Sequence, residues 1–237
     1  MTCADPPAAD PIASALAAVR ARIEAACVRV GRDPRGVTLV AVSKTKPASD
    51  VVRAHDAGQT LFGENRVQEA LSKQAEVDRP VEWHLVGALQ RNKARHAVGA
   101  FSLLHGVDNE KLLVEIDRRA AAEGVRQAVL VQVRLGGEEA KSGIDAAALP
   151  GLIDAALACE SVDLRGLMTI PPPADRPEDA RRWFSALREL RDVEAARTGA
   201  PLPDLSMGMT GDFEVAVEEG ATLVRVGTAI FGARGSA

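Results

Sequence analysis

Short apolar segments alternate with amphipathic segments along almost the whole chain, and this alternation limits the folds that the chain can adopt. The apolar segments have strand length and lie at 37–43, 60–63, 82–86, 102–107, 127–133, 162–168, 203–207 and 222–226. Amphipathic segments of helical period lie at 12–30, 48–57, 65–77, 90–99, 109–123, 145–158, 176–198 and 211–219. Eight strands with helices between them, in 237 residues, favour an α/β fold of the (β/α)8 TIM-barrel type over an open doubly wound sheet.

A single domain is predicted for residues 12–237. Gly31 follows the first helix, where a glycine C-cap is expected. The three prolines at 171–173 directly follow a predicted strand, so we interpret them as a strand-to-helix loop and not as a linker. Residues 1–11 are rich in Ala, Pro and Asp and have no basic segment, which predicts a disordered tail and not a signal peptide.

Composition narrows the classes of partner. The formal net charge of −4 argues against a nucleic-acid binder, because such proteins neutralise phosphates with excess Lys and Arg. No apolar run approaches the length of a membrane span. The 3 cysteines are scattered, which predicts a reducing, cytoplasmic location and no disulfide framework. The 4 histidines show no metal-ligand spacing.

Lys44 is the first candidate for a reactive residue. The apolar run 37–43 leads directly into it, and alternation along a strand places Thr38, Val40, Val42 and Lys44 on one face. Loss of solvation favours a neutral amine, which can attack a carbonyl carbon and form a Schiff base. The alternative is a lysine that extends from the strand end into water.

The last two predicted strands end in loops suited to an anion. Barrels of this type often bind phosphate with the loops after strands seven and eight. Ser206, Gly208, Gly227 and Thr228 are small residues in these loops, so backbone amides can approach an anion closely. Together with Lys44 and Arg225 they predict a site for a phosphorylated aldehyde, with pyridoxal phosphate as the obvious candidate.

Each of these residues also has a structural interpretation. The glycines could simply mark turns, and Arg225 could form an ion pair with Glu214 or Glu218. His84, on an apolar strand, is expected to be a hydrogen-bonded core residue more often than a catalyst. Glu64 could act as a base, although a carboxylate at a strand end more often orients a neighbouring group.

In its motifs the chain resembles the pyridoxal phosphate homeostasis proteins, the YggS/PROSC family. The resemblance covers about residues 12 to 234. Its motifs, in chain order, are 40–47 (VAVSKTKP), 62–65 (FGEN), 83–87 (WHLVG) with Gln90 and 92–93, 141–143 (KSG), 164–168 (LRGLM), 206–209 (SMGM) and 224–232 (VRVGTAIFG). The chain departs from the usual family pattern at Arg66, Thr210 and Gly211. None of these departures touches Lys44, the phosphate loop or Arg225.

The resemblance implies a barrel similar to the amino-terminal domain of alanine racemase, which is the type III fold of pyridoxal phosphate proteins. It implies pyridoxal 5'-phosphate bound as an internal aldimine to Lys44. By the same match Ser206, Gly227 and Thr228 hold the phosphate, Asn65 lies near the ring, and Arg225 faces the pyridine nitrogen.

The resemblance also bears on catalysis. An arginine at the pyridine nitrogen disfavours ring protonation and makes the cofactor a weaker electron sink. Alanine racemases use a catalytic tyrosine and a carboxy-terminal β-domain, whereas this chain contains 0 tyrosines and ends soon after the last barrel motif. We therefore expect a non-catalytic protein that holds the cofactor for homeostasis and passes it to apo-enzymes.

Two alternatives remain open. One is an amino-acid racemase or lyase with Lys44 as one base and His84 or a water as the other. The other is a class I aldolase-like barrel that uses Lys44 without a cofactor. We also expect a monomer, and expect Lys46, Lys93 and Lys141 to assist cofactor exchange from the barrel mouth.

Overall fold

The structure, a computed structural model, describes residues 10–136, 142–173 and 175–233. Eight parallel strands form a closed barrel, in which the first strand pairs with the last and β4 pairs with β5. The barrel strands are β1 (Thr38–Val42), β2 (Leu61–Glu64), β3 (Glu82–Leu85), β4 (Leu103–Val107), β5 (Gln127–Arg134), β7 (Val162–Met168), β8 (Asp204–Ser206) and β9 (Leu223–Val226). The predicted (β/α)8 fold and all eight predicted strands are confirmed.

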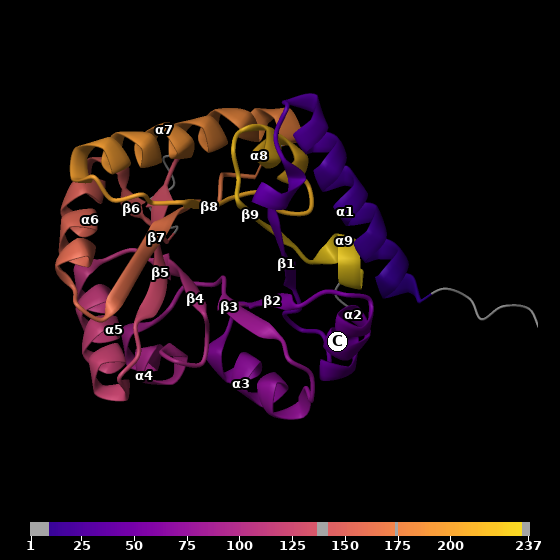
Figure 1. The fold of residues 1–237 in the computed structure, drawn as a ribbon, viewed down its shortest axis with the longest axis horizontal. Coiled ribbons are helices and arrows are strands. Elements are labelled where there is room, and N and C mark those ends of the chain that lie inside the picture. Colours follow the sequence, from indigo (N-terminus) through magenta and orange to yellow (C-terminus); the bar gives the residue numbers. More distant parts are fainter. Residues whose placement is uncertain (1–9, 137–141, 174, 234–237) are drawn as a thin grey trace, which may run out of the picture.

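Helices surround this ring of strands on the outside (Figure 1). They are α1 (Pro11–Arg29), α2 (Ala48–Asp56), α3 (Val67–Glu76), α4 (Ala94–Ala97), α5 (Glu110–Glu123), α6 (Leu149–Ala158), α7 (Arg181–Thr198), α8 (Phe213–Glu218) and α9 (Thr228–Phe231). The extra amino-terminal helix α1 packs against α2, α8 and α9. Within the described ranges, no helix is both long and apolar enough to cross a membrane.

The ends of α1 follow from its sequence. The helix begins at Pro11, one residue before the predicted start, because proline is favoured in the first turn and Asp10 caps the helix. The Asp10 carboxylate accepts a 2.7 Å hydrogen bond from the Ile12 amide. Gly31 adopts φ 67 just after the helix end, as expected for a C-terminal glycine. Of the predicted tail, residues 1–9 lie outside the described part of the chain.

Two elements differ from the prediction. The short helix α9 was not predicted, and neither was β6 (Ile144–Asp145), a two-residue strand that pairs with β5 beside the barrel. In addition, the predicted helices at 90–99, 145–158 and 176–198 each begin with a turn of 3₁₀ helix, at Arg91–Lys93, Ala146–Ala148 and Pro177–Ala180. A fourth 3₁₀ turn, Pro34–Gly36, precedes β1. These pieces are too short to show helical or strand periodicity.

Apolar side chains form two layers, one on each side of the barrel wall. The outer layer lies between the strands and the helices. The inner layer fills the barrel with Val40, Val42, Leu61, Val86, Leu103, Leu130, Met168 and Leu223. Since side chains alternate along each strand, the residues that follow the inner layer at the carboxyl ends point toward the barrel mouth.

Candidate cofactor site

A cavity of about 550 Å³ opens at the carboxyl ends of the strands. Five of the six predicted site residues line it: Lys44, Asn65, Arg225, Gly227 and Thr228. The remaining lining residues come from the carboxyl-terminal ends of the strands and the segments that follow them; they are Val42, Lys46, Val86, Gly87, Ala88, Gln132, Ser142, Ile170, Met209, Thr210, Gly211, Phe231 and Gly232. The fold therefore gathers groups that are far apart in the sequence around one opening.

Lys44 follows β1 and is exposed to the cavity and solvent. The prediction that burial desolvates its amine is therefore wrong for the structure, since apolar neighbours lie beneath the lysine and not around it. What the protein fixes is the backbone of Lys44. The next residue, Thr45, has a left-handed backbone with φ 63, and its amide donates to the Glu69 carboxylate.

A buried ion pair supports this loop from behind. Glu64, at the end of β2, points outward toward α3, where Lys73 Nζ lies 2.5 Å from its Oε1. Lys73 Nζ also donates to the Ser43 carbonyl at 2.8 Å, and the Ser43 hydroxyl donates to Glu64 at 2.6 Å. These contacts fix the residue before Lys44, just as Glu69 fixes the residue after it.

Two roles were predicted for Glu64, a base or a group that orients its neighbours, and its contacts agree with the second. Burial raises the pKa of Glu64, and the contacts with Lys73 and Ser43 offset part of that effect. The second carboxylate oxygen is buried without a hydrogen-bond partner. The support for the Lys44 loop is therefore a strongly coupled unit whose parts depend on one another.

Arg225 forms the floor of the cavity from its position on β9. Its guanidinium donates to the Ser206 hydroxyl at 2.5 Å and to the Thr169 carbonyl at 2.9 Å. Burial lowers the pKa of Arg225 to about 10, and nearby Asp212 partly opposes the shift. The alternative of an ion pair with Glu214 or Glu218 is wrong, because those carboxylates pair with arginines at the surface.

Ser206 is the one predicted site residue that does not line the cavity. It is fully buried on β8, and its hydroxyl contacts Arg225 and His105 inside the barrel. Its contact with phosphate stays a prediction. The observed contacts show a different task, which is to hold the guanidinium of Arg225.

The loops after β8 and β9 come close to the neighbouring backbone, and this requires glycine at two positions. A Cβ on Gly227 would lie 2.9 Å from the Val42 carbonyl oxygen. Gly208 has φ 90, and a Cβ there would lie 2.5 Å from the Ala216 side chain. Gly227 and Thr228 open the helical turn α9 at the cavity, so the first amides of this turn have no partner within the helix. Such amides can bind an anion.

Of the three lysines predicted to assist cofactor exchange, the structure places only Lys46 at the cavity among those it describes. Lys46 lines the cavity, and its Nζ donates to the Ala233 carbonyl at 2.9 Å. Lys93 lies in the 3₁₀ turn before α4 and is not among the lining residues. Lys141 lies outside the described residues. Their roles in cofactor exchange stay predictions.

Sequence reasoning missed several contributors to the site. Gln132 and Ile170 line the cavity, yet Gln132 was predicted only as part of a strand and Ile170 was not singled out. Lys73 was missed because a lysine on an amphipathic helix is normally exposed. The sequence did place Lys73 in the helix that directly follows Glu64, but this position alone did not indicate that the lysine is buried.

The fold and the site together define a class: a single (β/α)8 barrel with a lysine after its first strand and an arginine on its last strand, both at one cavity. The family model for the alanine racemase N-terminal domain matches residues 15–235. Among solved structures, PipY of Synechococcus elongatus, whose structure is described with pyridoxal phosphate bound, is 39% identical with a TM-score of 0.83. The match covers 93% of this chain and 100% of PipY.

Curated relatives agree with this class. The pyridoxal phosphate homeostasis protein of Aquifex aeolicus is 45% identical over 92% of this chain and 96% of its own length. The Escherichia coli protein of the same name is 42% identical over 94% and 97%. An alanine racemase of Corynebacterium glutamicum, at 19% identity and a TM-score of 0.70, shares the fold. The chain belongs to the family of the pyridoxal phosphate homeostasis proteins, as its motifs indicated.

Proposed function

We propose that this protein binds pyridoxal 5'-phosphate at Lys44 and takes part in pyridoxal phosphate homeostasis, delivering the cofactor to apo-enzymes without robust turnover of its own. The observation that supports it most is the convergence of Lys44, Arg225, Gly227 and Thr228 on one cavity. The relatives' names and the ligand of PipY point to the same cofactor.

The residues present fit this cofactor. Pyridoxal phosphate supplies an aldehyde that condenses with a primary amine and releases water. Lys44 offers the exposed amine, and the α9 turn at Gly227 and Thr228 offers amides and a hydroxyl for phosphate. Arg225 presents only donors, so it favours an unprotonated ring nitrogen, and Asn65 lies at the same opening.

The absence of turnover is proposed from the chemistry of the lining. Of the described residues that line the cavity, those with titratable side chains are Lys44, Lys46 and Arg225. His84, the second base of the racemase alternative, is buried in the barrel and is not among the lining residues. Stereoinversion needs two opposed acid–base groups. Lys44 is the better candidate for one of these groups, because Lys46 Nζ already donates to the Ala233 carbonyl.

The proposal extends to partners and location. We propose that pyridoxal phosphate-dependent apo-enzymes receive the cofactor, that the protein acts as a monomer, and that it works in the cytoplasm. The open mouth supports transfer, because the exposed amine of Lys44 can be reached from solvent. The described cysteines are a buried Cys27 and a half-buried Cys159, both free, which suits a reducing compartment.

Visible absorption of the purified protein, with and without added cofactor, tests the proposal. We expect a band from bound cofactor in the wild type, its loss in Lys44→Ala, and its retention in the matched control Lys93→Ala. A wild type that stays colourless with added pyridoxal phosphate would overturn the cofactor assignment and favour the aldolase-like alternative. Steady-state turnover of any amino acid would instead overturn the non-catalytic part.

A further inference from the structure

A column of hydrogen-bonded side chains runs through the barrel beneath Arg225. Ser206 Oγ, which accepts from Arg225, lies 2.8 Å from His105 Nδ1. His105 Nε2 lies 3.0 Å from His84 Nδ1, and His84 Nε2 lies 3.3 Å from a carboxylate oxygen of Glu82. The column joins the floor of the cavity to the amino-terminal end of β3.

The column is buried except at its far end. Ser206 and His105 are fully buried and His84 is 4% exposed, whereas the side chain of Glu82 is 55% exposed. The column crosses the barrel between four strands. Arg225 lies on β9, Ser206 on β8, His105 on β4 and His84 on β3. A buried polar group is costly without a partner, whereas a fully hydrogen-bonded buried network makes the core rigid.

With both imidazoles neutral, the direction of each hydrogen bond follows from the two ends of the column. A guanidinium can only donate, and an ionised carboxylate can only accept. Ser206 therefore accepts from Arg225 and donates to His105 Nδ1. His105 then donates from Nε2 to His84 Nδ1, and His84 donates from Nε2 to Glu82. Both imidazoles are neutral in this arrangement, and no hydrogen in the column lacks an acceptor.

The surroundings favour the same protonation. Burial, with His84 and Arg225 nearby, lowers the pKa of His105 well below its usual value. Glu82 on β3 and Arg225 on β9 are the charged ends of the column. At the cavity end, Asp212 after β8 acts electrostatically on Arg225, and Lys44 after β1 lines the same cavity. An added proton on His84 would reverse both histidine tautomers and leave the Ser206 hydrogen without its acceptor.

We infer that His105 and His84 are positioning residues for Arg225, which keep Ser206 oriented as the acceptor that holds the guanidinium on the cavity floor. This inference rests on the proposed function, in which Arg225 faces the cofactor ring. The histidines do not touch the cavity, so they act on cofactor binding only through Ser206 and Arg225.

Variants at His105 test this role in the full-length protein. His105→Phe keeps a ring but removes both nitrogens, and we expect pyridoxal phosphate to bind about tenfold more weakly, with a shifted visible band. His105→Gln keeps one acceptor and one donor and should recover most of the affinity. His96→Gln, an exposed histidine on α4, is the control and should match the wild type.

A double-mutant cycle separates this role from a general loss of stability. If His105 acts through Ser206, adding His105→Phe to Ser206→Ala should weaken binding no further than Ser206→Ala alone. Additive losses, or wild-type affinity and spectrum in a folded His105→Phe protein, would overturn the inference.

Nitrogen-15 NMR of the cofactor-free wild type gives a readout that needs neither a folded variant nor bound cofactor. We expect His105 to be neutral near pH 7, and expect both His105 and His84 to carry a proton at Nε2. A charged His105, or one protonated at Nδ1, would overturn the inference. If the tautomers are as expected but no cofactor binds to the wild type, the proposed function fails while the column stands.

Discussion

The buried ion pair between Lys73 and Glu64 links two neighbouring elements to the residue before Lys44. Both side chains are almost completely buried, at 6% and 0% exposed. Such pairs contribute little net stability when both members are present, because desolvation offsets their attraction. Loss of one member is costly, since the other charge stays buried.

Lys73→Met should therefore destabilise the protein strongly. We expect the free energy of unfolding to fall by about 3–5 kcal/mol, because the Glu64 carboxylate loses its cation. Adding Glu64→Gln should recover part of this loss, since the amide needs no counter-charge. Chemical denaturation of both variants provides the measurement. A single variant as stable as wild type would show that the pair is not coupled to the fold.

Glu82, at the exposed end of the polar column, predicts a pH dependence. The hydrogen bond from His84 lowers the pKa of Glu82 from 4.5 to about 2. A carboxylate with a lowered folded-state pKa stabilises the folded state above its unfolded pKa, and this stabilisation is lost as pH falls through the folded value. Solvent screening at this exposed side chain limits the contribution to about 1 kcal/mol.

Wild type should therefore exceed Glu82→Gln in unfolding free energy at pH 6, and the difference should shrink between pH 4.5 and about 2. Denaturation curves across this range test the expectation. Glu123→Gln, a change on the last turn of α5, is a control that should show no such convergence. A difference that grows as pH falls would contradict the assigned sign.

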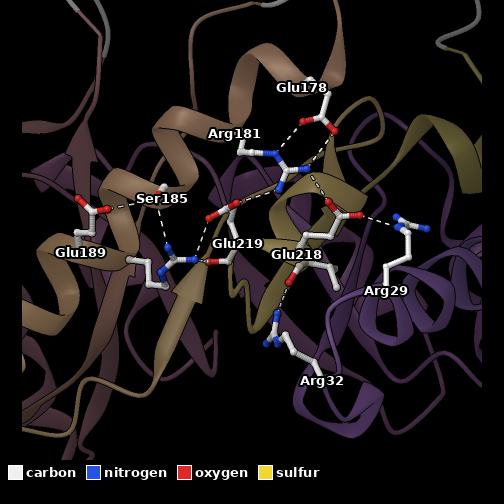
Figure 2. Close-up of polar contacts among 10 residues, drawn as sticks. Arg29, Arg32, Glu178, Arg181, Ser185, Glu189, Glu218 and Glu219 are labelled. Carbon is white, nitrogen blue, oxygen red and sulfur yellow. Dashed lines mark hydrogen bonds and ion pairs between the residues drawn. The ribbon is translucent and has the colours of Figure 1, made fainter.

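Among the elements, α8 is held by buried apolar residues and also, at its carboxyl end, by a network of ion pairs. Arg181 at the start of α7 contacts Glu218 at 2.6 Å and Glu219 at 2.8 Å, at the end of α8 (Figure 2). Arg29 on α1 contacts Glu218 as well, and Arg188 contacts Glu219. Because α8 follows the loop from β8 that borders the cavity, this network holds the loop's far end.

Arg181→Met should lower the free energy of unfolding by about 1–2 kcal/mol at low salt, because one cation serves several carboxylates. The deficit should decrease as salt screens the network in the wild type. Arg176→Met, which removes an exposed pair with Asp179, should cost about 0–1 kcal/mol. Equal losses in the two variants, or a loss independent of salt, would contradict the role of the network.

The elements were predictable to different degrees for physical reasons. The eight strands could be predicted because most of them are short and largely apolar, with side chains buried on both sides of the barrel wall. Helix α9 could not, since four residues carry no period and its form depends on the close approach of Gly227 to β1. The β6 pairing depends on β5 reaching past the barrel wall.

The part of the candidate site that could be predicted consists of residues at the carboxyl ends of strands. Lys44, Arg225 and Gly227 stand at strand ends, which parallel-barrel geometry alone places together. The column could not be predicted, because its members lie on β3, β4, β8 and β9 and meet only when the barrel closes. The hydroxyl of Ser206 illustrates the limit: its position was found from the sequence, but its contacts were not.

Closure of the barrel joins the two ends of the described chain in one unit. β1 pairs with β9, and the cavity draws on loops from Lys44 to Gly232. The apolar layers are continuous around the ring, so no part of the described chain has a core of its own. A ligand in the cavity should therefore stabilise the whole molecule and not a part of it.

Thermal unfolding tests both the single domain and the site. We expect one transition, and pyridoxal phosphate at about 100 times its dissociation constant should add about 2.7 kcal/mol of stability. For a chain of this size that corresponds to a rise in Tm of roughly 5–10 °C. Pyridoxal, which has the aldehyde but no phosphate, is the control and should raise Tm much less, because the α9 turn has no anion to bind. Two transitions, or a shift confined to one of them, would show that the barrel does not unfold as a single unit.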